Sequence, residues 1–139
     1  EFQLGQLGAI VNDTSGTRLY KYLQYDTGSA GAAAVAGEVA YYYTLDGYKN
    51  FQVTSDLSDS VEIGAGVIQA VMTDGQYGWF QVTGVATLTI ALTAGADGDP
   101  LTPTGSADGT LDVSSAATDN VCAIAGDISD KEIICTFPL

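Results

Sequence analysis

The chain has 139 residues and a mass of 14.3 kDa, which is enough for one domain with its own core. Hydrophobic residues make up 46% of the sequence and charged residues 15%, a composition that excludes intrinsic disorder. The net charge is −13, and the four basic residues cannot neutralise several phosphates, so we expect no binding to nucleic acid. The sequence contains no histidine, which removes the usual catalytic triads and most zinc sites. We therefore expect a protein that is not an enzyme and holds no cofactor.

Short stretches rich in Val, Ile, Thr and Tyr alternate with glycines and with Asp, Asn and Ser clusters, a pattern that predicts an all-β fold. We expect one compact β-barrel or β-sandwich domain over residues 1–139, with an extended N-terminal arm (residues 1–8) and long loops. The predicted strands, in chain order, are Ala9–Asn12, Arg18–Tyr25, Glu38–Tyr43, Phe51–Thr54, Val61–Ile63, Gly66–Met72, Trp79–Thr83, Ala86–Leu92, Thr110–Val113, Asn120–Ala125 and Glu132–Phe137.

The segments between these strands are predicted to be loops. Ala30–Val35 is rich in alanine, but it is too short and too closely bracketed by glycine to form a stable helix. Ser55–Ser60 and Ala94–Gly109 are expected to be long loops, which in compact domains are usually functional or interfacial. Asp97 and Asp99 lie near glycines, but their spacing is not that of a calcium loop, so we expect turn aspartates and no metal site. No apolar run reaches the length of about 18 residues that a membrane span requires, and we expect no membrane partner.

The strand Arg18–Tyr25 alternates clearly between apolar and amphipathic residues. Its period of two places Leu19 and Leu23 on one face and Tyr20 and Tyr22 on the other. The chain has eight tyrosines, and a tyrosine combines a large apolar body with a polar tip. Two interpretations stay open: ordinary half-buried packing within a sheet, or contact with a subunit or host surface through one tyrosine face.

The last twenty residues predict a hairpin. If residues 126–131 form its loop, Ile124 lies opposite Ile133 and Cys122 opposite Cys135, and these side chains share an apolar face with Phe137. Cysteines opposite each other are close enough for a disulfide, whereas two small buried hydrophobic residues are the alternative. Both interpretations of Cys122 and Cys135 stay open.

The second half of the sequence carries a pattern found in small head proteins of tailed bacteriophages. Residues 66–86 read GVIQAVMTDGQYGWFQVTGVA, a strand followed by G-Q-Y-G-W-hydrophobic-Q and a second strand. Further matching segments are Ala96–Leu101, Gly105–Val113, Val121–Ala125 and Glu132–Phe137. The chain thus resembles the capsid decoration, or cement, proteins over most of residues 61–139. One departure is Cys122, where these proteins usually have a small residue such as glycine.

This resemblance implies a structural protein of the virion that binds the outer surface of the capsid and stabilises the shell by bridging neighbouring major capsid proteins. It also implies self-association as a trimer or dimer, and assembly in the host cytoplasm. The charge of −13 agrees with a surface that faces solvent rather than packaged DNA. Candidate contacts with the capsid or a second subunit are Phe2, Leu4 and Leu7 of the arm and Tyr20, Tyr22 and Tyr25 of the tyrosine-rich strand.

The alternative function is a carbohydrate- or receptor-binding β-module of a tail fibre or surface appendage. Exposed tyrosines and Trp79 are side chains on which sugars stack. Against this alternative, Trp79 belongs to the apolar run Trp79–Val82, so its burial in the core is expected.

Overall fold

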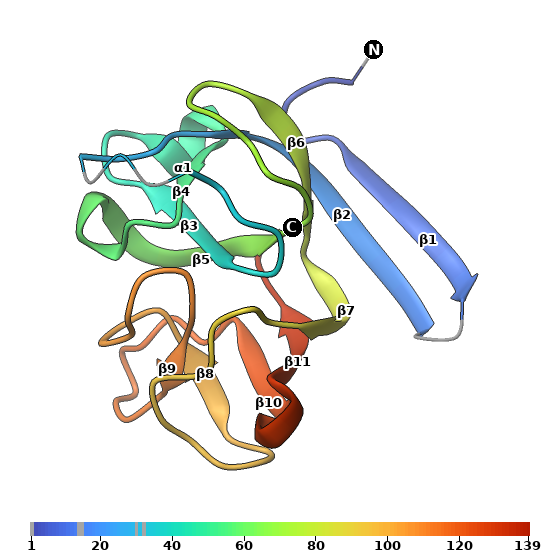
Figure 1. Cartoon of the computed structure of the whole chain (residues 1–139), viewed down its shortest axis with the longest axis vertical. Coiled ribbons are helices and arrows are strands. Elements are labelled where there is room, and N and C mark those ends of the chain that lie inside the picture. Colours follow the sequence, from blue (N-terminus) through green and yellow to red (C-terminus); the bar gives the residue numbers. More distant parts are fainter. Residues whose placement is uncertain (1, 14–15, 30, 32) are drawn as a thin grey trace.

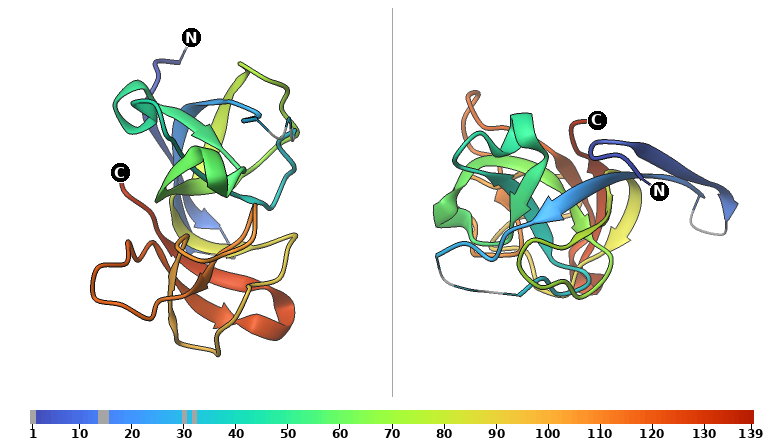
Figure 2. Two further views of the ribbon diagram at one scale, coloured as in Figure 1. Left: turned by 90° about the vertical axis from the view of Figure 1, so that its left-hand side faces the viewer. Right: turned by 90° about the horizontal axis from the view of Figure 1, so that it is seen from above.

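The computed structural model describes residues 2–13, 16–29, 31 and 33–139 and has two β layers, with a barrel above a second sheet (Figures 1 and 2). The barrel strands are β2 (Gly16–Tyr25), β3 (Val39–Tyr43), β4 (Gln52–Thr54), β5 (Ser60–Ile68) and β6 (Tyr77–Gln81). The second sheet consists of β7 (Thr83–Thr87), β8 (Pro100–Thr102), β9 (Asp112–Val113), β10 (Ala123–Asp127) and β11 (Glu132–Thr136). The predicted all-β class is confirmed.

Strand β2 closes the barrel. It pairs in parallel with β4 near Tyr25 and antiparallel with β6 over Tyr20–Gln24, so the order β2-β4-β3-β5-β6 returns to β2. Strand β1 (Leu7–Asp13) pairs with the first part of β2, and the β1–β2 hairpin projects from the barrel (Figure 1). Residues 2–6, predicted as part of an arm, lie against the same strand: the Gly5 amide donates to the Tyr22 carbonyl (2.7 Å). Glu1, Ala30 and Ala32 lie outside the described residues.

The buried side chains of the described residues form two hydrophobic cores, and β3 contributes to both. Tyr42 packs inside the barrel with Leu23, Tyr25 and Phe80, among others. Tyr41 points the opposite way, into the core between the barrel and the second sheet. Because β3 is covered on both faces, these two consecutive tyrosines are both fully buried, and the packing interpretation is confirmed for them.

One ribbon links the two layers. β6 ends at Gln81 and β7 begins at Thr83, with buried Val82 between them. The Val82 amide donates to the Leu19 carbonyl of the barrel (2.9 Å), and its own carbonyl accepts from the Phe137 amide beyond β11 (3.0 Å). The same residue therefore hydrogen-bonds to both layers.

Several predicted elements need correction. The strand predicted at Ala86–Leu92 was wrong beyond Thr87, because the chain leaves the sheet there and the Thr89 amide donates to the Gly37 carbonyl (2.9 Å). Residues Val61–Ile63 and 66–68 belong to the single strand β5. The loop predicted at Ala94–Gly109 contains β8, in which Leu101 lies opposite Ala123 of β10 and is fully buried. Among the described residues, three short helical elements were not predicted: α1 (Gly47–Asn50) and the 3₁₀ turns η1 (Leu57–Asp59) and η2 (Ile128–Asp130).

The predicted register of the C-terminal hairpin was wrong by one residue. Ala123, not Cys122, lies opposite Cys135, and Ile124 lies opposite Ile134. The register shifts between Ala125 and Asp127, where Gly126 takes up the extra residue as a bulge before the 3₁₀ turn η2 (Ile128–Asp130). Ile124 is consequently 39% exposed instead of sharing the buried face.

The two cysteines are free, buried thiols. Cys122 precedes β10, and Cys135 projects from β11 into the interlayer core. Burial raises the pKa of the Cys135 thiol to about 12 and also raises the pKa of the Cys122 thiol, so both stay protonated at neutral pH.

Candidate binding surface

Aromatic side chains gather on the outer face of β2 and β6. The inward positions of these strands are occupied by buried Leu23 and Phe80, so the pleat turns the intervening residues outward. Tyr22 lies directly opposite Trp79, with ring centroids 5.2 Å apart. The ring of Tyr77 is nearly parallel to that of Tyr22, at a centroid distance of 6.1 Å and an interplanar angle of 15°.

The N-terminal segment adds a further ring to this face. Phe2 is 54% exposed, and its ring lies 4.9 Å from Trp79 in an edge-on arrangement and 5.4 Å from Tyr22. A depression of about 260 Å³ is lined by Phe2, Leu4, Tyr22 and Tyr77. We call Phe2, Tyr20, Tyr22, Tyr77 and Trp79 the aromatic surface.

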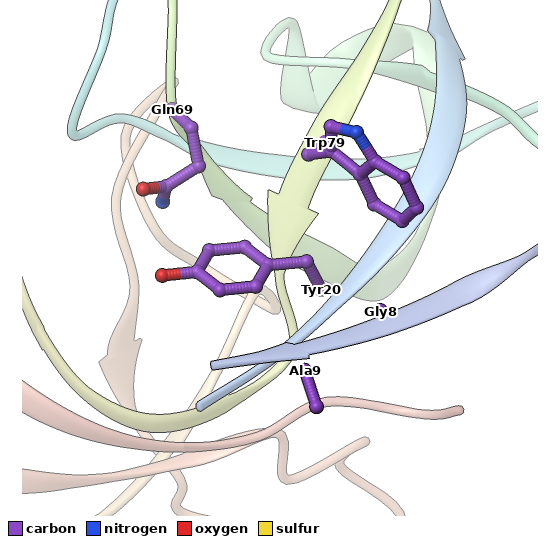
Figure 3. A pocket seen from close by; sticks show the side chains of 5 residues that line it. All are labelled: Gly8, Ala9, Tyr20, Gln69 and Trp79. Carbon is purple, nitrogen blue, oxygen red and sulfur yellow. The ribbon is translucent and has the colours of Figure 1, made fainter. Parts of the chain in front are cut away.

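A separate groove lies on the other side of Trp79. It measures about 410 Å³ and is lined by Gly8, Ala9, Tyr20, Gln69 and Trp79 (Figure 3). Gly8 of β1 permits the close approach of the indole, since a Cβ at this position would lie 3.3 Å from the ring. The Gln69 carboxamide nitrogen donates to the Val67 carbonyl (3.0 Å), which fixes the side chain at the edge of the groove.

The described residues that line the groove carry no charge. The lysine of β2 points away from it: Lys21 is 4% exposed and donates from Nζ to the Tyr42 hydroxyl (3.1 Å) inside the barrel. The ammonium group also lies 5.3 Å from the centre of the Phe51 ring, and burial lowers its pKa. Because this cation is directed inward, it supplies no positive charge to the groove.

The structure brings together most of the predicted contact residues. Phe2 and Leu7 are exposed, Leu4 is half-buried near Phe2, and Tyr20 and Tyr22 face outward from β2. Leu7 lies opposite Lys21 in the β1–β2 pairing, so its side chain is on the other face of the hairpin from Tyr20 and Tyr22.

Tyr25 does not belong to this group. It is fully buried in the barrel, and its hydroxyl forms a 2.7 Å hydrogen bond with Ser55 Oγ, so its prediction as a contact residue was wrong. The alternation of β2 already places Tyr25 on the same face as Leu23, which is the signal that could have excluded it.

Two members of the surface were missed by the sequence analysis. Tyr77 was not singled out, and Trp79, for which burial was expected, is half-buried on the outer face. The alternation of side chains along β6 could have identified Trp79 as an outward residue: Phe80 points into the core, so its neighbour Trp79 points outward.

The acidic loops contain no comparable site. The carboxylates of Asp97, Asp99 and Asp108 accept hydrogen bonds from the backbone amides of Ile128, Ala96 and Leu57, respectively. In the part of the chain that the structure describes, no group of His, Cys, Asp or Glu side chains is arranged to hold a metal ion. The helices in that part are all too short to span a membrane.

Comparison with known proteins identifies the architecture. No protein-family model matches the sequence, and no curated protein matches it. A solved structure with the same fold is the N base of the head fiber protein gp8.5 of bacteriophage phi29, with a TM-score of 0.52 and 15% sequence identity. The alignment covers 88% of this chain and 98% of the phage protein. At this identity the likeness establishes a shared fold.

Proposed function

We propose that this chain is a structural protein of a bacteriophage virion that binds the outer surface of the head and stabilises the shell by bridging neighbouring major capsid proteins. The observation that carries the proposal is the fold shared with the base of a phage head fiber over 88% of the chain. The net charge of −13 supports it, because an acidic protein is repelled by packaged DNA and tolerated on the solvent side.

We further propose that the N-terminal segment makes the shell contact. Phe2 and Leu7 are 54% and 44% exposed. Phe2 and Leu4 also line one depression together with Tyr22, so the N-terminal segment offers apolar area to a partner. Burying such side chains against a partner is favourable by about 25 cal/mol per Å² of apolar surface. Self-association as a trimer or dimer would multiply this contact at each site on the shell.

Stabilisation would follow from mass action. A protein that binds the assembled lattice and not its dissociated subunits stabilises the lattice by RT ln(1 + [L]/Kd), about 2.7 kcal/mol per site at a hundredfold excess over Kd. Because the sites repeat over the whole shell, modest individual contacts raise the temperature at which the particle breaks.

Add-back of purified protein to shells that lack it tests this proposal. We expect cosedimentation with shells and a higher disruption temperature; equal disruption temperatures for bare and saturated shells would contradict the function. Changing Phe2, Leu4 and Leu7 together to Ser should abolish cosedimentation. The matched control is Leu45→Ser, which removes another apolar side chain, 74% exposed, from the turn before α1 and should leave binding intact.

A module of a fibre or surface appendage that binds a receptor is the second candidate function. It is favoured by one observation, the outward position of Trp79 on the aromatic surface. Labelling of whole particles separates the two candidates: signal over the head facets supports the shell-binding protein, and signal restricted to a fibre supports the appendage module.

A further inference from the structure

The groove between Tyr20 and Trp79 lies beside the proposed shell contact but differs from it in composition. We propose that this groove binds one neutral hexopyranose unit of a polysaccharide. The inference goes beyond attachment to the head, since it assigns a ligand to a groove that is not part of the proposed shell contact.

The size and lining of the groove agree with a sugar ring. Its volume of about 410 Å³ lies within the range of about 300–1,000 Å³ that is usual for small-molecule sites. The walls are the rings of Tyr20 and Trp79 and the small residues Gly8 and Ala9. A pyranose ring presents a C–H face that packs on an aromatic ring. Because Gly8 has no side chain, the indole lies close against β1 and forms one wall of the groove.

Polar atoms at the edge can meet the sugar hydroxyls. Among the described residues, the Tyr20 hydroxyl and the Gln69 carboxamide oxygen have no hydrogen-bond partner. In Figure 3 the Gln69 carboxamide lies near the hydroxyl end of Tyr20, on the side away from Trp79. Because the Gln69 nitrogen is already held by the Val67 carbonyl, the oxygen is positioned to accept from a ligand hydroxyl with little further loss of side-chain freedom.

Charge selects the class of sugar. None of the described residues that line the groove is basic, and the protein as a whole carries −13, so phosphorylated or carboxylated polymers gain no ion pair there and are repelled over longer range. A proline-rich peptide is the other ligand that packs on Tyr and Trp side chains, but it requires several ridges for successive prolines. Two rings bordered by β1 provide a platform for a single ring.

The sole tryptophan of the sequence reports binding directly, since Trp79 lines the groove. The full chain is titrated with maltohexaose, cellohexaose, chitohexaose and mannohexaose, and the emission of Trp79 is followed, with calorimetry as a second readout. We expect saturable binding of at least one of these sugars and weaker binding of polygalacturonate. Saturation by none of the four in either readout would overturn the inference, and so would preferential binding of a proline decamer.

Variants locate the site and separate it from head attachment. Gln69→Ala, which changes a groove residue outside the proposed shell contact, should weaken sugar binding by about tenfold while cosedimentation with shells is kept. Tyr20→Ser, measured for sugar binding alone, should weaken it at least as much. The triple Ser variant of Phe2, Leu4 and Leu7 should show the opposite behaviour. The control Tyr48→Ser removes a 49% exposed ring from α1, and an equal loss of sugar binding in this control would overturn the assignment to the groove.

Discussion

Tyrosines in the two cores and tyrosines on the aromatic surface differ in whether their hydroxyls have hydrogen-bond partners within the protein. Inside, the hydroxyls of Tyr25, Tyr41 and Tyr42 bond to Ser55, to the backbone of Thr110 and to Lys21, respectively. Outside, the hydroxyls of Tyr20, Tyr22 and Tyr77 have no partner among the described residues.

The difference follows from the cost of burial. A buried hydroxyl without a partner destabilises the fold, whereas a surface hydroxyl bonds to water and can exchange that water for a ligand. An excess of tyrosine in the sequence therefore has two causes here: the inner tyrosines fill a core that needs large side chains, and the outer ones are available for binding.

The sharpest test uses adjacent residues on opposite faces of β6. Phe80→Ala removes a fully buried ring from the barrel and should lower the free energy of unfolding by about 3–5 kcal/mol. Trp79→Ala, which removes a half-buried ring from the aromatic surface, should cost far less. Urea unfolding followed by circular dichroism measures both; equal losses would contradict the division between core and surface.

A smaller effect is expected at the tyrosine hydroxyls. Tyr41→Phe leaves the buried Thr110 amide without its 3.0 Å acceptor and should cost about 1–3 kcal/mol in unfolding free energy. Tyr20→Phe should change stability by less than about 0.5 kcal/mol. Thermal or urea unfolding of the pair measures this difference, and a neutral Tyr41→Phe would show that the interior hydroxyl is dispensable.

Alkaline pH should lower the free energy of unfolding through the buried thiols of the core. The unfolded Cys135 thiol ionises near pH 8.5, whereas burial raises its folded pKa to about 12. Burial of the neutral thiol therefore leaves the free energy of unfolding unchanged below pH 8.5. As the pH rises from there towards 12, the unfolded thiol ionises and the free energy of unfolding falls by up to about 1.4 kcal/mol per pH unit for each buried thiol. Denaturant titrations from pH 7 to 10 should show this decline. The double variant Cys122→Ala, Cys135→Ala should show a shallower decline, and an unchanged slope would contradict the assignment.

The smallest change concerns the groove. Gly8→Ala places a Cβ 3.3 Å from the Trp79 ring, which is half-buried and can shift by a few tenths of an ångström. We expect a stability change of less than about 0.5 kcal/mol and a displaced emission maximum of Trp79. A large loss of stability would mean that the indole is held as rigidly as a core residue.

Local patterns predicted much of this fold. The strand at Arg18–Tyr25 was predicted within two residues of β2, because a strand with one buried face and one outer face alternates visibly in sequence. The same alternation carried the prediction of Tyr20 and Tyr22 as outward residues. Applied consistently, it would also have moved Tyr25 inward and Trp79 outward.

The failures arose where tertiary contacts override local pattern. Leu88, Ile90 and Leu92 alternate like a strand, yet Leu88 makes the last contact beside β11, through the Lys131 carbonyl, and Thr89 then bonds to Ala36 and Gly37. The bulge at Gly126 shifted the C-terminal register, and a bulge leaves little trace in hydrophobic alternation. Closure of the barrel depends on β2 meeting β6 more than 50 residues later, which no local window contains.

The link through Val82 has a mechanical consequence. A pull applied at Trp79 and resisted by the lower sheet would run along the axis of the β6–β7 ribbon. The hydrogen bonds to β2 and β11 lie across that axis, so the load would shear many of them together instead of peeling them one at a time. If the protein is attached through one layer and pulled through the other, the force thus acts in the direction in which these hydrogen bonds must break together.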